Sequence, residues 1–559
     1  MNSKKYFSLH APWGLSNSHR LTITHATKNP ITPHTMKLPS ATEMQALDQR
    51  AIHHYQIPSI VLMENAGVGT VRMVEQELGS PANTFALIFI GPGNNGGDGL
   101  VIARHLHQRG CHPVLCYLVD PARLKGDAAI NAEICARLQL EWLLLDSDLA
   151  LAELQGLCCR LQETHGRCYA IIDAVFGTGL TRTVSDHYAT TLQLIHQRHL
   201  APEAPVIAVD MPSGLDADRG QILGACARAD HCATYGCAKP GQVQGEGPEL
   251  CGKLHIIDIG IPPEAVAEAG ILTEHITAAA IKQQMTALRR PYDTHKGGQG
   301  HLLLVAGGIG KTGAAILCAQ GALRSGCGLI SCCVPHSLNT IFESALFEAM
   351  TIPLPNSATL FDSSDLETIM SALQDKQALV LGPGLGTDPG TASLVLDLYR
   401  TVSQTMVVDA DGLNILAANL ESLEEPPGPR IFTPHPGEMA RLLGLTSKEV
   451  QEDRVKAAHR GCLQFDHGSS QCVMVLKGAH TVVATPDGRT WINSTGNPGM
   501  ASGGMGDVLS GLVGGLLCQG LSPVAAATTA VFIHGQAGDL LAAEQGIGYT
   551  ATDLARALP

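Results

Sequence analysis

From residue 41 onward, short apolar runs alternate with helical periods, and this alternation limits the possible folds more than any other feature of the chain. The first half contains five such runs, at Phe85–Ile90, Val114–Val119, Ala170–Ile172, Val206–Val209 and Leu254–Ile259. Continuous apolar runs of this length are typical of parallel strands that helices cover on both faces. We therefore predict a doubly wound, Rossmann-like α/β domain.

The alternation resumes after the Pro262–Pro263 pair and a weakly patterned stretch. Further strand-like runs lie at His301–Val305, Ala378–Leu381, Thr405–Val408, Ile431–Phe432, Cys472–Leu476 and Thr481–Ala484. The glycine loops of the two halves differ, which indicates a fusion of two α/β domains and not a repeat. We predict a disordered extension at 1–37, a first domain at 38–265, a linker at 266–285 and a second domain at 286–559.

The composition excludes several classes of protein. The chain has 559 residues, too many for one hydrophobic core, and its 60 glycines suit tight turns between strands and helices. A net charge of −14 without a basic stripe excludes a nucleic-acid surface. No apolar run is long enough to cross a membrane. The 17 cysteines include no C-x-x-C pair, so we expect reduced thiols and a cytoplasmic location. A targeting segment, or a start at Met36, is an alternative interpretation of the extension.

The run N-P-G-M-A-S-G-G-M-G-D, Asn497 to Asp507, precedes an apolar helical pattern. Gly503, Gly504 and Gly506 leave bare N–H groups ahead of a helix, and these groups attract anions together with the helix dipole. A carboxylate in such a cradle repels a phosphate unless it accepts a proton. The run therefore indicates phosphoryl transfer to a hydroxyl, with Asp507 as the base. The alternative is a glycine-rich helix start with a solvated aspartate.

Polar side chains follow three predicted strands of the first half. G-P-G-N-N-G-G-D-G follows the first strand as a loop over Gly91–Gly99, ahead of a helix over 100–108, and contains the weak signal G-x-G-x-x-G. Asp173 and Asp210 follow two others. Carboxyl ends of parallel strands line one crevice, so we expect Asn95, Asp173, Asp210 and Ser213 to converge there. For each aspartate alone, a helix N-cap is the alternative.

The three motifs G-P-G-N-N-G-G-D-G, D-A-V-F-G-T-G-L and V-D-M-P-S-G-L-D resemble those of the NAD(P)H-hydrate epimerase domain, over about residues 38–265 and including E-N-A-G at Glu64–Gly67. The resemblance implies a nicotinamide nucleotide that is hydrated at C6 of its ring, and interconversion of its R and S epimers. It implies a potassium site at Asn95, Asp173 and Ser213, and Asp210 as the acid–base group. The implied substrate-binding residues are Asn94, Asn95, Gly96, Gly97, Asp98, Gly177, Thr178, Gly179, Leu180, Thr181, Arg182, Thr183 and Asp210.

Four clusters in the second half are also informative. Gly310-Lys311-Thr312 looks like the end of a P-loop, but Val305 occupies the position of the first glycine, which excludes Walker-type binding. The others are G-P-G-L-G at Gly382–Gly386, T-P-H-P-G-E at Thr433–Glu438, and K-G-A-H-T at Lys477–Thr481, whose lysine can reach a phosphate. With Asn497–Asp507 these clusters resemble the ribokinase-like NAD(P)H-hydrate dehydratase domain, over about residues 280–555.

This second resemblance implies dehydration of the S epimer with ADP, giving NAD(P)H, AMP and phosphate, because the fused form resembles the bacterial enzymes. It implies Mg²⁺ on the nucleotide, although no protein ligand for Mg²⁺ is identifiable. The implied substrate-binding residues are Ala314, Gly386, His435 and Asp507. The implied nucleotide-binding residues are Lys477, Gly478, Ala479, His480, Thr481, Asn497, Pro498, Gly499, Met500, Ala501, Ser502, Gly503, Gly504, Met505 and Gly506.

Two other functions stay open at this point. A vitamin or sugar kinase fused to an NAD-binding domain keeps Asp507 as base but releases a stable phosphorylated product. A nucleotide-sensing or scaffold role for the first domain is disfavoured by the retained Asn95, Asp173, Asp210 and Ser213. We expect small-molecule partners only, NADHX, NADPHX and ADP, and a homo-oligomer.

Overall fold

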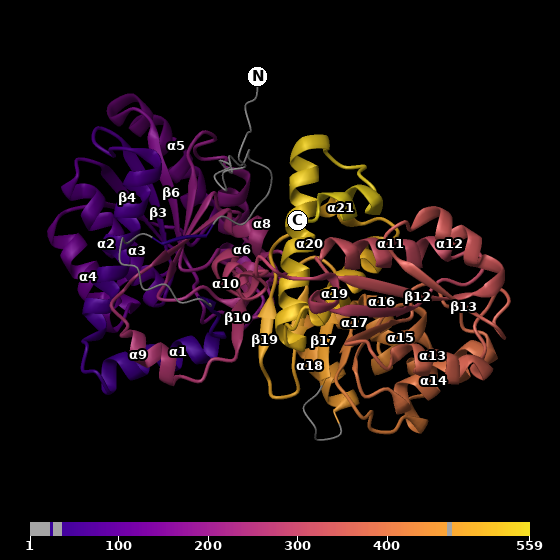
Figure 1. The fold of residues 1–559 in the computed structure, drawn as a ribbon. Coiled ribbons are helices and arrows are strands. Elements are labelled where there is room, and N and C mark those ends of the chain that lie inside the picture. The colour runs from indigo at the N-terminus through magenta and orange to yellow at the C-terminus, as the bar shows by residue number, and fades with distance from the viewer. Residues whose placement is uncertain (1–22, 26–35, 467–471) are drawn as a thin grey trace.

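The computed structural model describes residues 23–25, 36–466 and 472–559, which form two α/β domains (Figure 1). The N-terminal sheet has eight strands in the order β1-β9-β8-β7-β6-β3-β4-β5, and all its pairings are parallel. Its strands are β1 Ile23–His25, β3 Phe85–Ile90, β4 His112–Tyr117, β5 Glu141–Leu144, β6 Cys168–Ala174, β7 Val206–Val209, β8 His231–Tyr235 and β9 Lys253–Ile257. This arrangement confirms the predicted Rossmann-like fold class.

Helices cover both faces of the N-terminal sheet and create a separate core on each. One face packs against α2 Ser59–Leu78, α3 Asn94–Gln108 and α4 Gly126–Arg137. The other packs against α5 Asp148–His165, α6 Asp186–Gln197 and α8 Gly247–Cys251. The shorter α1 Ala41–His53, α7 Pro240–Val243 and α9 Pro263–Glu268 complete the domain. Burial on both faces explains why its strands are continuously apolar.

The C-terminal sheet has eleven strands in the order β13-β12-β11-β14-β15-β16-β17-β18-β19-β10-β2. The strands are β2 Met36–Lys37, β10 Thr273–His275, β11 His301–Val305, β12 Leu329–Pro335, β13 Met350–Leu354, β14 Ala378–Leu381, β15 Thr405–Val408, β16 Arg430–Phe432, β17 Cys472–Leu476, β18 Val482–Ala484 and β19 Thr490–Ile492. Neighbours from β13 to β17 are parallel, whereas β17, β18 and β19 pair antiparallel.

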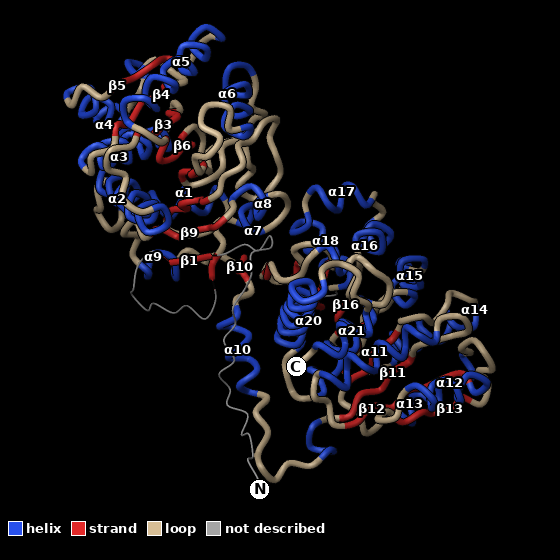
Figure 2. Tube along the Cα trace, turned by 90° about the horizontal axis from the view of Figure 1, so that it is seen from above, coloured by secondary structure: helices blue, strands red, loops and turns tan. Residues whose placement is uncertain are grey.

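The C-terminal sheet also lies between two helical layers, which are visible around the strands in Figure 2. One face carries α10 Ala278–Ala287, α11 Thr312–Arg324, α12 Asn339–Ala345, α19 Met505–Cys518, α20 Pro523–Gln545 and α21 Ala551–Ala557. The other carries α13 Leu366–Leu373, α14 Pro389–Thr401, α15 Asp411–Ala418, α16 Pro436–Leu443, α17 Ser447–Glu452 and α18 Arg454–Phe465.

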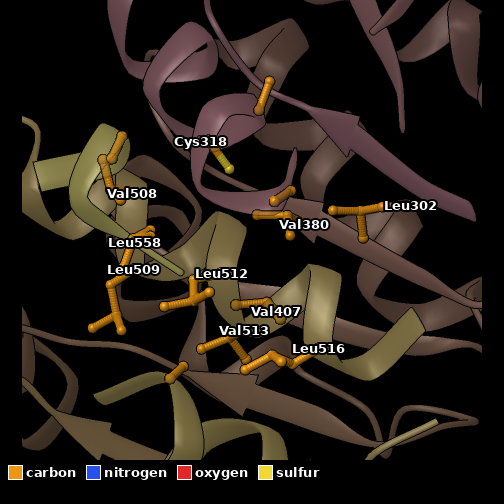
Figure 3. Close-up of a cluster of buried hydrophobic side chains, with 14 of the residues drawn as sticks. Leu302, Cys318, Val380, Val407, Val508, Leu509, Leu512, Val513, Leu516 and Leu558 are labelled. Atoms are coloured by element: carbon orange, nitrogen blue, oxygen red, sulfur yellow. The ribbon is translucent and has the colours of Figure 1, made fainter. Parts of the chain in front are cut away.

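Helix α19 is the central helix of its layer. Figure 3 shows its side chains Val508, Leu512 and Leu516 among residues of the sheet and of α11. Glycines permit the contact with α11, because a Cβ on Gly511 would lie 1.8 Å from the Cys318 carbonyl oxygen and a Cβ on Gly321 2.2 Å from that of Val508. The backbones of the two helices therefore touch, and the start of α19 is held rigidly.

The predicted glycine loop Gly91–Gly99 is wrong from Asn94 onward, because α3 begins there and not at residue 100. The reason is tertiary. A Cβ on Gly96 would lie 2.2 Å from the Gly91 carbonyl oxygen, and one on Gly99 2.6 Å from the Ala174 Cβ. These glycines let a helix approach the strand ends closely.

The predicted disorder at 1–37 is wrong for five residues, since Ile23–His25 pairs with β9 and Met36–Lys37 with β10. Residues 1–22 and 26–35 of that prediction lie outside the described residues. The predicted linker 266–285 contains β10 and most of α10, and β10 belongs to the C-terminal sheet, where it pairs with β19. The domains are joined by packing as well, because Ile492 of β19 lies in a core of the N-terminal domain.

Within the described ranges, no helix is both long and apolar enough to span a bilayer. All 17 cysteines carry free thiols and most are buried, as the sequence predicts.

Candidate active sites

The polar residues predicted at the strand ends of the N-terminal domain do converge, around Phe176 and Gly177. Ser213 Oγ accepts a hydrogen bond from the Phe176 N–H at 2.8 Å and lies 2.5 Å from Asp173 Oδ1. A Cβ on Gly177 would lie 3.1 Å from Asn95 Oδ1 and 3.3 Å from Asp210 Oδ2. A side chain on Gly177 would be crowded by both residues, so the Asn95 and Asp210 side chains both lie beside this glycine.

Asp173 is completely buried, and no basic side chain of the described residues pairs with it. Its Oδ2 accepts from the Ser213 N–H at 2.8 Å. Burial raises the pKa of Asp173 to about 6, although the Ser213 hydrogen bonds oppose the rise. A buried carboxylate without a counter-charge, beside the Ser213 hydroxyl that also contacts the Phe176 carbonyl, offers oxygen donors of the kind that a hard cation prefers.

Asp210 has a lysine partner that the sequence analysis missed. Lys239 Nζ lies 2.5 Å from Asp210 Oδ1 and is itself completely buried. The other Nζ hydrogen bonds go to Thr234 Oγ1 at 2.9 Å and the Tyr235 carbonyl at 3.2 Å. Asp210 also has a left-handed φ of 62°. Neither aspartate is a helix N-cap, so that alternative is wrong for both. Lys239 follows β8 by four residues, at the same sheet edge as the predicted residues, and that position is the missed signal.

Two further carboxyl groups interact with this pair. Burial raises the pKa of Asp48 to about 6, Lys239 lowers it, and Asp210 raises it. Burial, with Asp210 and Asp48, raises the pKa of Asp98 well above its usual value. The Lys239 ammonium is thus the positive charge shared by the carboxyl groups of Asp210, Asp48 and Asp98. Burial favours the protonated form of Asp98.

The predicted substrate segment Gly177–Thr183 borders a cavity of about 140 Å³. The cavity is lined by Phe176, Leu180, Arg182, Thr183, Val184, Ser185, Asp186, His187 and Tyr188. Thr181 and Arg182 are exposed, whereas Gly96 and Gly97 are buried. Gly96 and Gly97 therefore pack closely against their neighbours and expose no surface to a ligand.

In the C-terminal domain, the glycine run lies at the start of α19. Gly504 is the N-cap with a φ of 90°, and no side chain caps the helix. A Cβ on Gly503 would meet only open space, and a Cβ on Gly506 would lie 3.2 Å from Lys477 Nζ. Unpaired N–H groups and a lysine therefore face one point, as an anion site requires.

Asp507 is the acidic residue in the first turn of α19. The pKa of Asp507 is raised to about 7. Burial is the largest cause, the charge of Asp409 adds to the rise, and the charge of Lys477 opposes it. Lys477 Nζ lies 2.6 Å from Asp409 Oδ1, and Ser510 Oγ donates to Asp409 Oδ2 at 2.5 Å. A carboxylate with a pKa near neutrality is suited to proton transfer. The sequence analysis missed Asp409, although it follows the strand Thr405–Val408 directly.

The residues predicted to hold the second substrate lie around this group. Gly386 N–H donates to Asp411 Oδ2 at 2.9 Å, and the same carboxylate lies 2.8 Å from Lys311 Nζ. A Cβ on the neighbouring Gly384 would lie 3.1 Å from the Ala314 Cβ. The first turn of α11, which carries Ala314, is therefore packed against the loop that carries Gly386.

His435 is the N-cap of α16, where its Nδ1 accepts from the Gly437 N–H at 3.0 Å. The His435 N–H in turn donates to Glu438 Oε2 at 2.7 Å. Burial, with Lys477 and Arg441, lowers the pKa of His435. The side chain of His435 is exposed, with its Nε2 3.5 Å from Glu438 Oε1, so it can hydrogen-bond a ligand at this surface.

Hydrogen bonds to Asn497 hold the start of the predicted nucleotide-binding run Asn497–Gly506. Asn497 Oδ1 accepts from the Gly499 N–H at 3.0 Å and from Tyr549 Oη at 2.9 Å. Ala501, Ser502 and Gly503 are exposed, as are Gly478 and Ala479. Met505 is different, because its side chain is buried in the core, and only its backbone remains for a ligand.

No group of three or more His, Cys, Asp or Glu side chains has metal-binding geometry in the described part of the chain.

Comparison with known families agrees with the division of the chain into an N-terminal and a C-terminal domain. Residues 59–241 match the YjeF-related protein N-terminus, and residues 302–559 match NAD(P)H-hydrate dehydratase. A solved structure of an ADP/ATP-dependent NAD(P)H-hydrate dehydratase from Bacillus subtilis, co-crystallized with ATP/Mg²⁺, is 31% identical, covering 49% of this chain and 95% of that chain with a TM-score of 0.42.

Full-length relatives match across both domains. The bifunctional NAD(P)H-hydrate repair enzyme Nnr of Moorella thermoacetica is 42% identical over 515 residues, which is 91% of this chain and 93% of the relative. The protein of the same name from Escherichia coli K12 is 34% identical over 529 residues, 94% of each chain. The chain belongs to the family of bifunctional NAD(P)H-hydrate repair enzymes.

Proposed function

We propose that the N-terminal domain interconverts the R and S epimers of hydrated NADH and NADPH, and that the C-terminal domain dehydrates the S epimer with ADP to give NAD(P)H, AMP and phosphate. The observation that carries the proposal is Asp507, a carboxylate with a pKa of about 7 at the uncapped start of α19 beside Lys477. The family membership agrees with both activities.

Dehydration begins with a hydroxyl that becomes a better leaving group. Asp507 accepts the proton of the ring hydroxyl while that oxygen attacks the terminal phosphorus of ADP. The new P–O bond replaces the bond to AMP. The N–H groups of Gly503–Gly506 and the Lys477 ammonium stabilise the transferred phosphoryl group. The C6–O bond then breaks, phosphate leaves, and loss of a proton from C5 restores the dihydronicotinamide ring.

Epimerisation needs reversible loss of the same hydroxyl, because C6 carries the ring nitrogen and can form an iminium ion. We infer that Asp210 transfers the proton between the hydroxyl and water on the two faces of the ring. The buried Lys239 ammonium, 2.5 Å away, stabilises the negative charge of this carboxylate and fixes its orientation.

We further propose a potassium ion at Asp173, Ser213 and Asn95, since the buried Asp173 carboxylate has no basic side chain beside it among the described residues. The ion would supply the missing positive charge and hold the Phe176–Gly177 turn. Mg²⁺ would enter the site bound to the nucleotide phosphates. Besides Asp409, the carboxylate of Glu438 also lies near Lys477, with its Oε2 4.0 Å from Lys477 Nζ. Both ions would act through their positive charge.

The test uses the purified protein with mixed hydrated NADH epimers and ADP. Dihydronicotinamide absorbance and AMP should both rise until all the substrate is consumed. Asp507→Asn should abolish both signals. Asp210→Asn should stop the reaction after the S epimer is consumed, and its AMP yield should fall by the share of the R epimer.

Two outcomes would contradict the proposal. A stable phosphorylated product without dihydronicotinamide would support the vitamin or sugar kinase instead. Complete conversion by Asp210→Asn would remove the acid–base role of that residue.

Replacing ADP by ATP in the same assay decides nucleotide preference, and we expect ADP to give the higher kcat/KM. Replacing K⁺ by Li⁺ should slow only the epimerisation.

A further inference from the structure

The segment that joins α17 to α18 lies between the two domains. Gln221 Nε2 of the N-terminal domain donates to the Glu452 carbonyl at 2.8 Å, and Arg219 Nε lies 3.5 Å from Asp453 Oδ2. Val455 packs against a core of each domain. Asp453 is also the N-cap of α18, where it accepts from the Lys456 N–H at 3.0 Å. The start of α18 is therefore fixed by the N-terminal domain.

The next residue, Arg454, extends in the other direction, toward the run Lys477–Thr481. Its Nη2 donates to the Leu476 carbonyl at 2.9 Å and to the Lys477 carbonyl at 3.3 Å. A Cβ on Gly478 would lie 3.3 Å and 3.4 Å from its two terminal nitrogens. The guanidinium thus lies directly beneath the peptide between Lys477 and Gly478.

Burying the charged Arg454 side chain costs desolvation free energy, and only 8% of the surface of this residue is exposed. No carboxylate of the described residues pairs with it, and its buried Nε has no hydrogen-bond partner. Apart from Gln451, its hydrogen bonds go to the Leu476 carbonyl, at the end of β17, and to the Lys477 carbonyl, at the start of the nucleotide-binding run. Burial lowers its pKa to about 10, so it still carries a charge at neutral pH. The feature that accounts for this buried charge is the run above it.

The peptide geometry shows what Arg454 does for that run. In a trans peptide, the carbonyl and the following N–H point in opposite directions. Since the Lys477 carbonyl is directed at Arg454, the Gly478 N–H is directed away from it, on the exposed side of the run. The φ of 132° at Gly478 is one that glycine adopts readily. The same arrangement holds Lys477, whose ammonium faces the start of α19.

We propose that Arg454 is a positioning residue for the nucleotide of the dehydration reaction, and that the N-terminal domain keeps it in place through its contacts with Glu452 and Asp453. This inference rests on the proposed function and deepens it. Arg454 orients the Gly478 N–H and Lys477 toward the nucleotide phosphates without contacting them. The N-terminal domain consequently supports nucleotide binding in the C-terminal domain.

The first test replaces Arg454 in the full chain and measures steady-state dehydration of the S epimer. Arg454→Ala should raise the KM for ADP at least about tenfold, because hydrogen bonds from a buried charge are lost. Arg454→Lys keeps the positive charge but lacks the planar guanidinium with its several N–H donors, so it should raise the KM for ADP less. The KM for hydrated NADH should stay unchanged. Arg460→Ala is the matched control, since this exposed arginine of the same helix donates to the Leu443 carbonyl at 3.3 Å.

A wild-type KM for ADP in Arg454→Lys and Arg454→Ala overturns the positioning role. If circular dichroism shows that Arg454→Ala does not fold, Arg454→Lys decides, because it retains the charge. An equal rise in both KM values would show general damage and overturns the role as well. Should the wild type form no AMP, the proposed function fails, and calorimetric titration of ADP into the same variants still tests Arg454.

The second test breaks the domain contact at its N-terminal side. Arg219→Ala combined with Gln221→Ala should raise the KM for ADP about two- to fivefold and leave epimerisation unchanged. Arg228→Ala is the control, since Arg228 pairs with Glu249 inside the N-terminal domain at 3.6 Å. An unchanged KM for ADP in the double variant would show that the N-terminal domain does not hold Arg454 in place.

Discussion

The proton-accepting role of Asp507 makes dehydration pH-dependent in a way that a neighbouring carboxylate controls. With a pKa of about 7, Asp507 is half protonated near neutrality. Only its carboxylate form can accept the hydroxyl proton, so kcat should rise with pH through about 7 and level off above. The rise from 3.8 to about 7 corresponds to about 4 kcal/mol, with burial as the largest cause and Asp409 as the second.

Asp409→Asn changes this profile in a predictable direction. The substitution removes a negative charge that raises the pKa of Asp507, and it frees Lys477, whose charge lowers that pKa. Both effects have the same sign, so the kcat profile should move to lower pH, by on the order of one unit. At pH 6, such a shift increases the ionised fraction of Asp507 about fivefold. The loss of positioning for Lys477 should appear separately, as a higher KM for ADP.

The assay is AMP release at saturating substrate between about pH 5.5 and 8.5. Asp375→Asn is a suitable control, because Asp375 is an exposed carboxylate that precedes β14, at the opposite end of the strand from the site. A profile of the wild type without an inflection near pH 7 would refute Asp507 as the base. A shift of the Asp409→Asn profile to higher pH would refute the electrostatic reasoning.

Three further predictions address single residues. Lys239→Met should abolish epimerisation and leave dehydration of pure S epimer intact, because Asp210 loses its ammonium partner whereas the charges around Asp507 are unchanged; equal loss of both activities would contradict the assignment. Gly511→Ala should lower the melting temperature and the dehydration rate, since its Cβ would lie 1.8 Å from the Cys318 carbonyl oxygen, whereas Gly313→Ala, with open space around its Cβ, should have little effect. Arg430→Met should lower the free energy of unfolding by about 3 kcal/mol in urea titration. The buried Arg430 guanidinium donates to the Tyr399 carbonyl at 2.8 Å and the Val402 carbonyl at 2.6 Å, and a wild-type value would refute that contribution.

Strand bounds were predictable where burial on both faces leaves an uninterrupted apolar run. Strands β3, β7, β11 and β14 have the predicted bounds, because their residues are buried on both faces and no polar position interrupts them. The start of α3 was not predictable, since Asn94, Gly96 and Gly99 read locally as a loop. The two glycines lie in a helix that packs closely, since a Cβ on Gly96 would meet the Gly91 carbonyl oxygen and one on Gly99 the Ala174 side chain, and the contact with Ala174 is not encoded within the run itself.

The sequence alone predicts two candidate sites, because chemistry at a strand end or a helix start leaves a local signature of glycines beside an acid. Asp507 and Asp210 were predicted in this way. Their electrostatic partners were not, because Asp409 is 68 residues from Lys477 and Lys239 is 29 residues from Asp210. A pKa depends on burial and on charges brought close by packing, and neither has a local pattern. What each carboxylate can do was therefore decided by tertiary structure, which placed a lysine beside Asp210 and an acid beside Asp507.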